Sequence, residues 1–261
     1  MTTMTALRIL VAEDSRVNQR VTLALLSKLG HIAVIANNGK EVLDTLAKGD
    51  FDLVLMDIQM PVLDGMQATA AIRASEQESG RHQPIIAVTA QALPGDHERC
   101  LTGGMDEYVS KPISKESLCR AIAIALGRPI STDTSASAEL NPGSSQKLVD
   151  WNSALRQLGG HLADLKEITE SYIQETGDNL SRLSTAIAAG NVQESKRLAH
   201  TVKGAMRFFH AEAAQQSGLE LETLAAAGDL TTASELFKRL TEEVDRVLPV
   251  LRHFIDTGEM Q

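Results

Sequence analysis

The chain has 261 residues, of which 43% are hydrophobic and 23% are charged, and its formal net charge is -9 at pH 7. This length allows two ordinary domains with separate cores, and the globular composition excludes a disordered or fibrous chain. The negative charge argues against a nucleic-acid partner, because little positive charge is available to neutralise phosphates. No apolar run is long enough to span a bilayer, and the first residues lack a signal-peptide pattern. We therefore expect a cytoplasmic protein without membrane insertion.

The first half of the chain alternates short β-rich runs with amphipathic stretches. The runs are RILVAED, HIAVIA, FDLVLMD, PIIAVTA and DEYVS, and stretches such as VNQRVTLALLSKLG and KESLCRAIAIALG lie between them. Five strands that alternate with helices predict a parallel sheet with helices on both of its faces. Ligands of such sheets bind outside the carboxyl ends of the strands, so the site is expected there.

A segment rich in Ser, Thr, Gly, Pro and Ala, Gly127 to Gln146, separates this half from the next and predicts a flexible linker. After the linker the β pattern disappears, and leucines such as Leu155 and Leu158 recur at helical spacing. Short breaks between these helical stretches favour an antiparallel helical bundle. The predicted domains are residues 1–126, an α/β fold, and residues 147–256, an all-α fold.

Polar residues stand at the ends of four of the predicted strands. In chain order these residues are Glu13, Asp14, Asp57, Thr89 and Lys111. Each of them has an ordinary explanation as a cap, turn or surface residue, but in a parallel sheet they converge on one rim. Neighbouring carboxylates repel each other, and Mg²⁺ relieves that repulsion. With a hydroxyl and an ammonium group the rim suits a phosphoryl group, with Asp57 as nucleophile and Lys111 balancing the developing charge.

The motifs VAEDS, LVLMDIQMPVLDG, AVTA and YVSKP together resemble the receiver domain of two-component response regulators, over essentially all of Ile9 to Leu126. The resemblance implies a doubly wound, flavodoxin-like sheet of five parallel strands in the order 2-1-3-4-5. It implies that Asp57 accepts a phosphoryl group from a phosphohistidine and holds it as an acyl phosphate. The Mg²⁺ ligands that it implies are Asp14, Asp57 and the Gln59 carbonyl, with Glu13 acting through water.

The same resemblance assigns roles to residues near the last two strands of the sheet. Thr89 and Tyr108 would form a switch pair, in which the hydroxyl is drawn to the phosphoryl group and the ring turns inward. The peptide bond between Lys111 and Pro112 would be cis, a conformation that is found almost only before proline. These roles depend on the family pattern and do not follow from the spacing of the residues.

A second candidate site lies in the segment SKRLAHTVKGAMRFFHA. Four apolar residues share one helical face and are expected to pack into the bundle: Leu198, Val202, Met206 and Phe209. His200 lies about 200° around the helix from Leu198, so we expect it to face solvent, with Lys203 and Arg207 on the same stripe. Gly204 costs a helix about 1 kcal/mol relative to alanine, and here it clears space beside the imidazole. An exposed histidine with cationic neighbours suits attack on an acyl phosphate.

The HTVKG context resembles the phosphorylated helix of histidine phosphotransfer domains, over about Leu148 to Phe254, and DWNSALRQLGG is similar to that family's first helix. The resemblance implies that His200 is a second phosphoacceptor, with Lys203 beside it. The chain departs from the small residues that are usual in this family at four positions: Met206, Arg207, Phe208 and His210.

The two resemblances together predict a phosphorelay protein like the C-terminal part of a hybrid sensor kinase. A sensor histidine kinase would phosphorylate Asp57, and the phosphoryl group would pass through His200 to a downstream receiver, or in the reverse direction. No glycine-rich phosphate loop or asparagine-box helix precedes the receiver motifs. We therefore expect a phosphoacceptor and phosphotransfer protein without an ATP-binding kinase domain, and not an enzyme with its own ATP site.

Other functions fit parts of the pattern. A Mg²⁺-dependent phosphohydrolase would also use Asp57 as nucleophile, but it needs a second acid close by, where this chain has Gln59. A pseudo-receiver scaffold would bind partners without phosphorylation, although every expected site residue is present. A transcription regulator would need a helix-turn-helix or a basic recognition stripe, and the second half of the sequence offers neither. Transfer of phosphate from a radiolabelled donor separates these functions.

Overall fold

The computed structural model describes residues 6–89, 96–111, 113–128, 148–158 and 160–260 of the chain. These residues form two compact units, one in each half of the chain, and each unit is described by itself. The predicted linker, residues 127–146, lies outside the described residues except for Gly127 and Arg128. The described helices include none with the length and apolar composition needed to span a bilayer.

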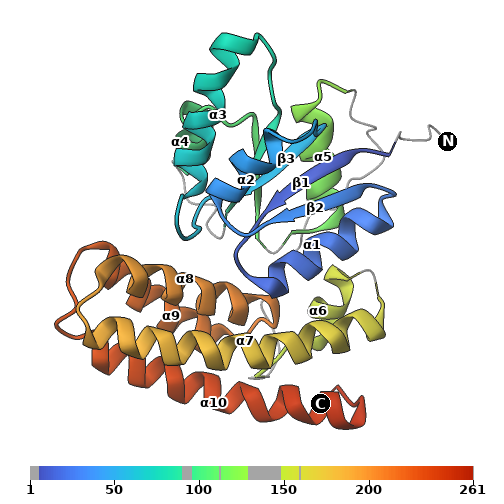
Figure 1. Ribbon diagram of the computed structural model, residues 1–261. Helices are drawn as coiled ribbons and strands as arrows, with labels where there is room; N and C mark the ends of the chain where they lie inside the picture. The colour runs from blue at the N-terminus through green and yellow to red at the C-terminus, as the bar shows by residue number, and fades with distance from the viewer. Residues whose placement is uncertain (1–5, 90–95, 112, 129–147, 159, 261) are drawn as a thin grey trace. The chain divides into compact units, whose positions relative to one another are not determined.

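The described part of the first unit alternates five strands with five helices (Figure 1). The strands are β1 (Arg8–Ala12), β2 (Ile32–Ala36), β3 (Leu53–Asp57), β4 (Ile85–Thr89) and β5 (Glu107–Ser110). The helices are α1 (Arg16–Lys28), α2 (Gly39–Leu46), α3 (Gly65–Ser79), α4 (Asp96–Thr102) and α5 (Lys115–Ala125). Neighbouring strands pair in parallel in the order β2-β1-β3-β4-β5, which confirms the predicted sheet.

The central strands explain the long apolar runs of the sequence. Every residue of β3 and of β4 is buried, because helices α2, α3 and α4 cover one face of the sheet and α1 and α5 cover the other (Figure 1). Parallel strands that are buried on both faces have near-continuous hydrophobic sequences, as LVLM and IIAV do here. Asp57 and Thr89 are the last residues of these two strands, so both polar residues lie at the carboxyl rim of the sheet.

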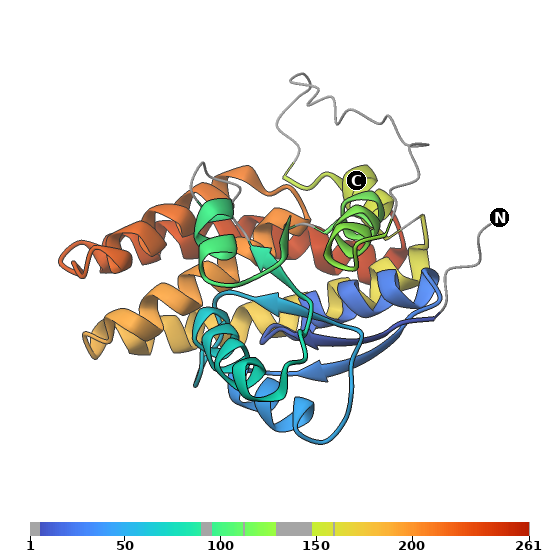
Figure 2. The ribbon, with the colours of Figure 1, turned by 90° about the horizontal axis from the view of Figure 1, so that it is seen from above.

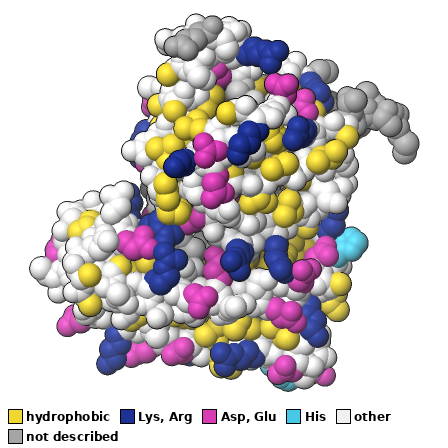
Figure 3. Space-filling model, in the orientation of Figure 1, with side chains coloured by type: hydrophobic (Ala, Val, Ile, Leu, Met, Phe, Trp, Pro, Cys, Tyr) yellow, Lys and Arg dark blue, Asp and Glu magenta, His cyan; other side chains and the backbone are white. Residues whose placement is uncertain are grey.

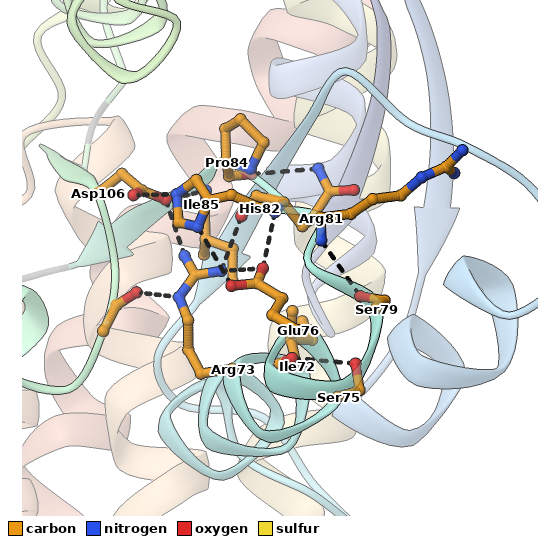
Figure 4. Close-up of polar contacts among 12 residues, drawn as sticks. Ile72, Arg73, Ser75, Glu76, Ser79, Arg81, His82, Pro84, Ile85 and Asp106 are labelled. Carbon is orange, nitrogen blue, oxygen red and sulfur yellow. Dashed lines mark hydrogen bonds and ion pairs between the residues drawn. The ribbon is translucent and has the colours of Figure 1, made fainter.

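A polar network fixes the connection between α3 and β4 to the start of β5 (Figure 4). Arg73 on α3 donates to Glu76 Oε1 at 2.5 Å and to Asp106 Oδ2 at 2.8 Å, and it also donates to two backbone oxygens. The ring nitrogens of His82 lie 3.2 Å from Glu76 Oε2 and 2.7 Å from Asp106 Oδ1. These contacts lie at the amino ends of β4 and β5, at the opposite end of the sheet from Asp57.

The second unit is a helical bundle, as predicted. Its helices are α6 (Trp151–Gln157), α7 (Leu162–Ala188), α8 (Val192–Phe208), α9 (Glu212–Ala226) and α10 (Ala233–Thr257). Helices α7, α8, α9 and α10 lie side by side in both ribbon views (Figures 1 and 2). Few residues connect one helix to the next, so consecutive helices run in opposite directions.

An aromatic cluster forms part of the core of this bundle. Trp151 on α6 lies 4.5 Å from Phe254 on α10 and 5.8 Å from Phe209, measured between ring centroids. Tyr172 on α7 packs edge to face on Phe209 at 4.6 Å. The four residues predicted to share the inner face of the His200 helix, α8 with its C-cap Phe209, are all buried, which confirms that face: Leu198, Val202, Met206 and Phe209.

Candidate functional site

Three carboxylates meet at the carboxyl rim of the sheet. Glu13 and Asp14 follow β1, Asp57 ends β3, and one oxygen of each lies within 4.8 Å of the others. Glu13 and Asp57 are buried, with 3% and 2% of their surfaces exposed, and Asp14 is half-buried. The parallel register of β1 and β3 brings these side chains together, since both strands end at the same level of the sheet.

Lys111, which follows β5, lies between two of these carboxylates. Its Nζ is 2.6 Å from Asp57 Oδ2 and 2.6 Å from Glu13 Oε2. Burial on its own would lower the pKa of Lys111, but the charges of Asp57 and Glu13 and their hydrogen bonds raise that pKa above its ordinary value. The buried side chain therefore keeps its positive charge. The backbone N–H of Lys111 donates to the Thr89 carbonyl at 2.6 Å, which holds the two strand ends together.

The acid beside Lys111 holds its proton unusually tightly. Burial raises the pKa of Glu13 to about 8, and the charges of Asp57 and Asp14 act in the same direction against the opposing charge of Lys111. A cation at this rim would offset the repulsion among the three carboxylates, and hard oxygen ligands are the kind that Mg²⁺ prefers. The residues present therefore fit a divalent cation.

The proposed switch residues lie on the neighbouring strands. Thr89 ends β4 and is buried, whereas Tyr108 is the second residue of β5 and is half-buried. In the parallel register Thr89 pairs with Ser110, so Tyr108 stands two residues earlier on the adjacent strand. Its ring packs against the core between the sheet and helices α2 and α3. The predicted cis bond involves Pro112, which lies outside the described residues.

The loop after β3 brings α3 close to the phosphoacceptor candidate. The backbone N–H of Gly65 donates to the Ile58 carbonyl at 3.0 Å and closes the loop. A Cβ at Gly65 would lie 2.1 Å from the carbonyl oxygen of Asp57, so only glycine fits there. The Gln59 backbone N–H donates to Asp57 Oδ1 at 3.2 Å, which leaves Gln59 next to the carboxylate.

The second candidate site lies between α8 and α9, and it differs from the prediction. His200 and Lys203 were expected to face solvent, but they are buried, with 8% and 5% of their surfaces exposed. That expectation was wrong, because α9 packs against this side of α8. Arg207 is half-buried on the same stripe, while a Cβ at Gly204 would meet nothing within 4 Å. The helix is therefore open to approach beside His200 at Gly204.

Glu222 on α9 connects the two buried residues of α8. His200 Nδ1 lies 2.8 Å from Glu222 Oε1, and Lys203 Nζ donates to Glu222 Oε2 at 2.6 Å. Burial would raise the pKa of Glu222, but the hydrogen bond and charge of His200 and the charge of Lys203 lower it to about 2. An ionised carboxylate accepts hydrogen bonds only, so Nδ1 carries the proton that it shares with Glu222. In a neutral imidazole this leaves Nε2 with a free electron pair.

Sequence reasoning did not find Glu222, because it lies on another helix, 22 residues after His200. One signal was available in the sequence. Glu222 occupies a position on the face of α9 that is otherwise small or apolar, together with Ala214, Gly218, Leu221 and Ala225. A buried acid needs a partner, so an acid in that pattern points to a cation on a neighbouring helix.

Basic side chains gather on the helix that carries His200. Figure 3 shows dark blue Lys and Arg side chains over α8. The basic residues of this helix are Lys196, Arg197, Lys203 and Arg207. Lys196, Arg197 and Arg207 are half-buried, and Arg197 pairs with Glu194. Lys196 lies four residues before His200 and Arg207 seven residues after it, on the same side of the helix. This side of α8 therefore favours a negatively charged partner surface or phosphoryl group.

Both candidate sites are followed by a residue with an unusual backbone. Among the described residues, Val62 and His210 are the non-glycine residues with positive φ, at 69° and 54°. Val62 lies in the loop after β3, and His210 lies in the connection between α8 and α9. Left-handed backbone is costly for residues with a Cβ. A residue without a Cβ would adopt this backbone at His210 with less strain.

The family comparisons agree with the two folds. The model of the response regulator receiver domain matches residues 9–123, and the model of the Hpt domain matches residues 167–248. The chain contains a receiver domain followed by an Hpt domain. This is the predicted architecture, and the prediction of two different domains in this order is confirmed.

Curated relatives of the receiver–Hpt chain are longer proteins. The sensor histidine kinase GacS of Pseudomonas protegens is 29% identical over 204 residues, which are 77% of this chain and 22% of that protein. The hybrid signal transduction histidine kinase I of Dictyostelium discoideum is 44% identical over 135 residues, which are 50% of this chain and 8% of that protein. The chain thus spans less than a quarter of the length of either relative.

Two solved structures resemble parts of the chain. The receiver domain of the sensor histidine kinase PA1611 from Pseudomonas aeruginosa, with a magnesium ion in its active-site cleft, is 42% identical, with a TM-score of 0.43. The match covers 47% of this chain and 99% of that one. In the complex of Ypd1 with the receiver domain of Ssk1 from Saccharomyces cerevisiae, the matched chain is 29% identical, with a TM-score of 0.44. That match covers 49% of this chain and 95% of the other.

Proposed function

We propose that this chain is a phosphorelay protein that carries a phosphoryl group between Asp57 of the receiver domain and His200 of the Hpt domain. One observation carries the proposal: a single chain holds two prepared nucleophiles in two domains of phosphotransfer families. The Asp57 carboxylate is held by Lys111, and the His200 imidazole is held by Glu222 with Nε2 free. A sensor histidine kinase would be the external donor, and a downstream receiver would be the final acceptor.

The first step is attack of an Asp57 carboxylate oxygen on the phosphorus of a phosphohistidine. The new P–O bond forms as the P–N bond breaks, and the leaving imidazole takes the electron pair. Lys111 contacts Asp57 Oδ2 and balances the negative charge that gathers on the transferred group. Asp14, Asp57 and the Gln59 carbonyl would hold Mg²⁺, with Glu13 acting through water. When bound there, Mg²⁺ supplies charge neutralisation at the phosphoryl oxygens.

The second step moves the phosphoryl group from the acyl phosphate on Asp57 to His200. The free electron pair of Nε2 attacks phosphorus, the P–N bond forms, and the Asp57 carboxylate leaves. The imidazole becomes positively charged, and Glu222 stabilises that charge through the bond at Nδ1. Lys203 keeps Glu222 ionised and in place. The same groups serve the reverse direction, because neither step consumes a proton.

Within this proposal, Thr89 and Tyr108 report the state of Asp57 to partner proteins. Thr89 ends β4, the strand next to β3, so it lies at the same rim of the sheet as Asp57. Tyr108 stands on the adjacent strand β5 and is half-buried, and the proposed switch would turn its ring inward. The relatives named above are histidine kinases, which supports a histidine kinase as donor.

The test uses the full chain and radiolabelled acetyl phosphate with Mg²⁺. The wild type is expected to form a base-labile species on Asp57 and then an acid-labile, base-stable species on His200. Asp57→Asn is expected to remove both species, because acetyl phosphate is expected to label the chain only through Asp57. His200→Gln is expected to remove only the acid-labile species. An acid-labile species in His200→Gln would show that the wrong histidine was chosen. A wild type that takes no label would favour the scaffold function.

The dependence on protein concentration shows which route the phosphoryl group takes. If Asp57 and His200 of one chain react with each other, the first-order rate constant of transfer is independent of protein concentration. If transfer occurs between molecules, that constant rises in proportion to concentration. Mixing Asp57→Asn with His200→Gln separates the routes directly, because only transfer between molecules labels His200 in that mixture.

A further inference from the structure

Gly218 lies inside α9, one helical turn before Glu222, where α9 packs against α8. A Cβ at Gly218 would lie 3.0 Å from the Cβ, 3.3 Å from the Cα and 3.5 Å from the backbone N of Lys203. Carbon atoms pack at about 3.5–4.0 Å, so a Cβ at this position requires the neighbouring segment of α8 to give way by a few tenths of an ångström. Gly218 is not among the glycines with positive φ, so its backbone conformation does not require glycine. Glycine weakens a helix interior relative to alanine, so the close packing against Lys203 is the remaining explanation for a glycine at this position.

This close packing occurs at one of the residues of the candidate site. Lys203 donates to Glu222 at 2.6 Å, and Glu222 lies 2.8 Å from His200 Nδ1. Residues four apart share one face of a helix, so Gly218 and Glu222 both face α8. The distance between the helices at Gly218 therefore sets how far the Glu222 carboxylate stands from the imidazole.

We propose that Gly218 is a positioning residue for the chemistry of His200. By letting the backbone of α9 lie against Lys203, it keeps Glu222 within hydrogen-bonding distance of Nδ1. The imidazole is thereby held in the tautomer whose Nε2 is free to attack phosphorus. The expected effect on phosphotransfer rests on the proposed function. The expected effect on the tautomer of the imidazole rests on the contacts between α8 and α9.

The first measurement is the tautomer of His200 in the full chain, from the nitrogen chemical shifts of its ring by NMR. The spectra are recorded at mildly alkaline pH and below the melting temperature of every variant, so that loss of stability does not enter the comparison. Gly218→Ala is expected to raise the population that carries the proton on Nε2. Gly177→Ala is the control, because Gly177 is an exposed glycine inside α7 and a Cβ there meets nothing within 4 Å. It is expected to leave the tautomer unchanged.

The second measurement is the rate at which phosphoramidate labels His200, in an Asp57→Asn background so that the receiver takes no part. Gly218→Ala is expected to slow labelling roughly three- to tenfold, the size that follows from a weakened hydrogen bond. In a Glu222→Ala background the same substitution is expected to cause no further loss, since its effect passes through Glu222.

Two results would overturn the role of Gly218. One is an unchanged tautomer in Gly218→Ala, and the other is an equal loss of rate with and without Glu222. The outcome for the proposed function is separate. A wild type that takes no label on His200 would contradict that function, while the tautomer comparison would still decide whether Gly218 positions Glu222.

Discussion

The receiver site and the Hpt site are built from the same pair of groups in opposite roles. Each site contains a buried lysine 2.6 Å from a buried carboxylate, Lys111 with Asp57 and Lys203 with Glu222. In the receiver the carboxylate is the proposed nucleophile, and the lysine balances the charge of the phosphoryl group. In the Hpt domain the carboxylate contacts the proposed nucleophile, His200, and the lysine holds that carboxylate. Similar ion pairs therefore have different proposed roles, and the third group in each site decides the role. That third group is Glu13 in the receiver and His200 in the Hpt domain.

The two sites also shift the pKa of a buried glutamate in opposite directions. Glu13 completes the receiver site, and burial, together with the charges of Asp57 and Asp14, raises its pKa to about 8. His200 completes the Hpt site, and together with Lys203 it lowers the pKa of Glu222 to about 2. The receiver rim gathers three carboxylates around one lysine and fits a further cation, whereas Glu222 in the Hpt site lies between a lysine and an imidazole. The predictions below test this difference, from the largest expected effect to the smallest.

Replacing each carboxylate by its amide has the largest expected effect and separates the two roles. Asp57→Asn is expected to abolish labelling of the receiver by acetyl phosphate, because an amide is a poor nucleophile. Glu222→Gln is expected to keep labelling of His200 by phosphoramidate within about tenfold, because an amide oxygen still accepts the Nδ1 hydrogen bond. Glu222→Ala lacks any acceptor and is the matched control, with an expected loss of about 10²-fold. Equal losses in Glu222→Gln and Glu222→Ala would contradict the orienting role.

Removing one acid from the receiver rim tests the cation site. Asp14→Ala is expected to weaken Mg²⁺ binding about tenfold or more, measured by calorimetry, because it deletes one of three clustered carboxylates. Lys111→Ala and Thr89→Ala are the controls, since neither is a proposed ligand. They are expected to keep most of the affinity and to impair transfer or switching. Unchanged affinity in Asp14→Ala would count against the site.

The two domains are expected to respond to pH in opposite directions. Without Mg²⁺, Glu13 has a folded pKa of about 8 against an ordinary value of 4.5, so the folded receiver binds the extra proton. Its stability therefore falls as pH rises from about 5 to 8, by at most about 1.4 kcal/mol per pH unit. Glu222 has a folded pKa of about 2 against 4.5, so its stabilising effect is present above pH 4.5 and is lost as pH falls toward 2.

Separate probes follow the two domains in that experiment. The single tryptophan, Trp151, lies in the Hpt bundle, so its fluorescence reports unfolding of that domain. Hydrogen exchange of the amides of β3 reports unfolding of the receiver. A receiver that gains stability between pH 5 and 8 without Mg²⁺ would contradict the charge arrangement at Glu13, and added Mg²⁺ is expected to remove most of the dependence.

The smallest expected effect concerns stability at the other end of the receiver sheet. Arg73→Ala is expected to lower the free energy of unfolding by about 1–3 kcal/mol, because it leaves the partly buried acids Glu76 and Asp106 without their cation. Arg81→Ala is the control, since its ion pair with Asp50 is almost fully exposed and such pairs contribute little. Thermal melts measure both variants. Labelling of Asp57 is expected to be normal in each, and a large loss would show that the network reaches the site.

Much of the receiver site could be predicted because its residues end consecutive parallel strands. Asp57 ends an apolar strand, and Glu13 and Asp14 follow β1. In a parallel sheet these strand ends lie at one rim, so the sequence pattern and the sheet topology together predict that the acids are neighbours. The contact of Lys111 with Glu13 as well as Asp57 could not be predicted, because it depends on where one long side chain lies among several acids. The Hpt site was predicted less completely. His200 was found from its own helix, but its burial and its partner depend on α9.

The sequence by itself determined the two fold classes, the order of the domains and the candidate nucleophiles, because strand alternation, helical periodicity and short motifs are local patterns. Only the tertiary structure decided which ring nitrogen of His200 is free and which acid orients it. It also decided how closely α9 approaches Lys203 and which acid shares Lys111 with Asp57. These features depend on distances of a few ångströms between segments 19 to 98 residues apart, from Lys203 to Glu222 and from Glu13 to Lys111. Packing sets such distances, and no periodicity within one helix or strand records them.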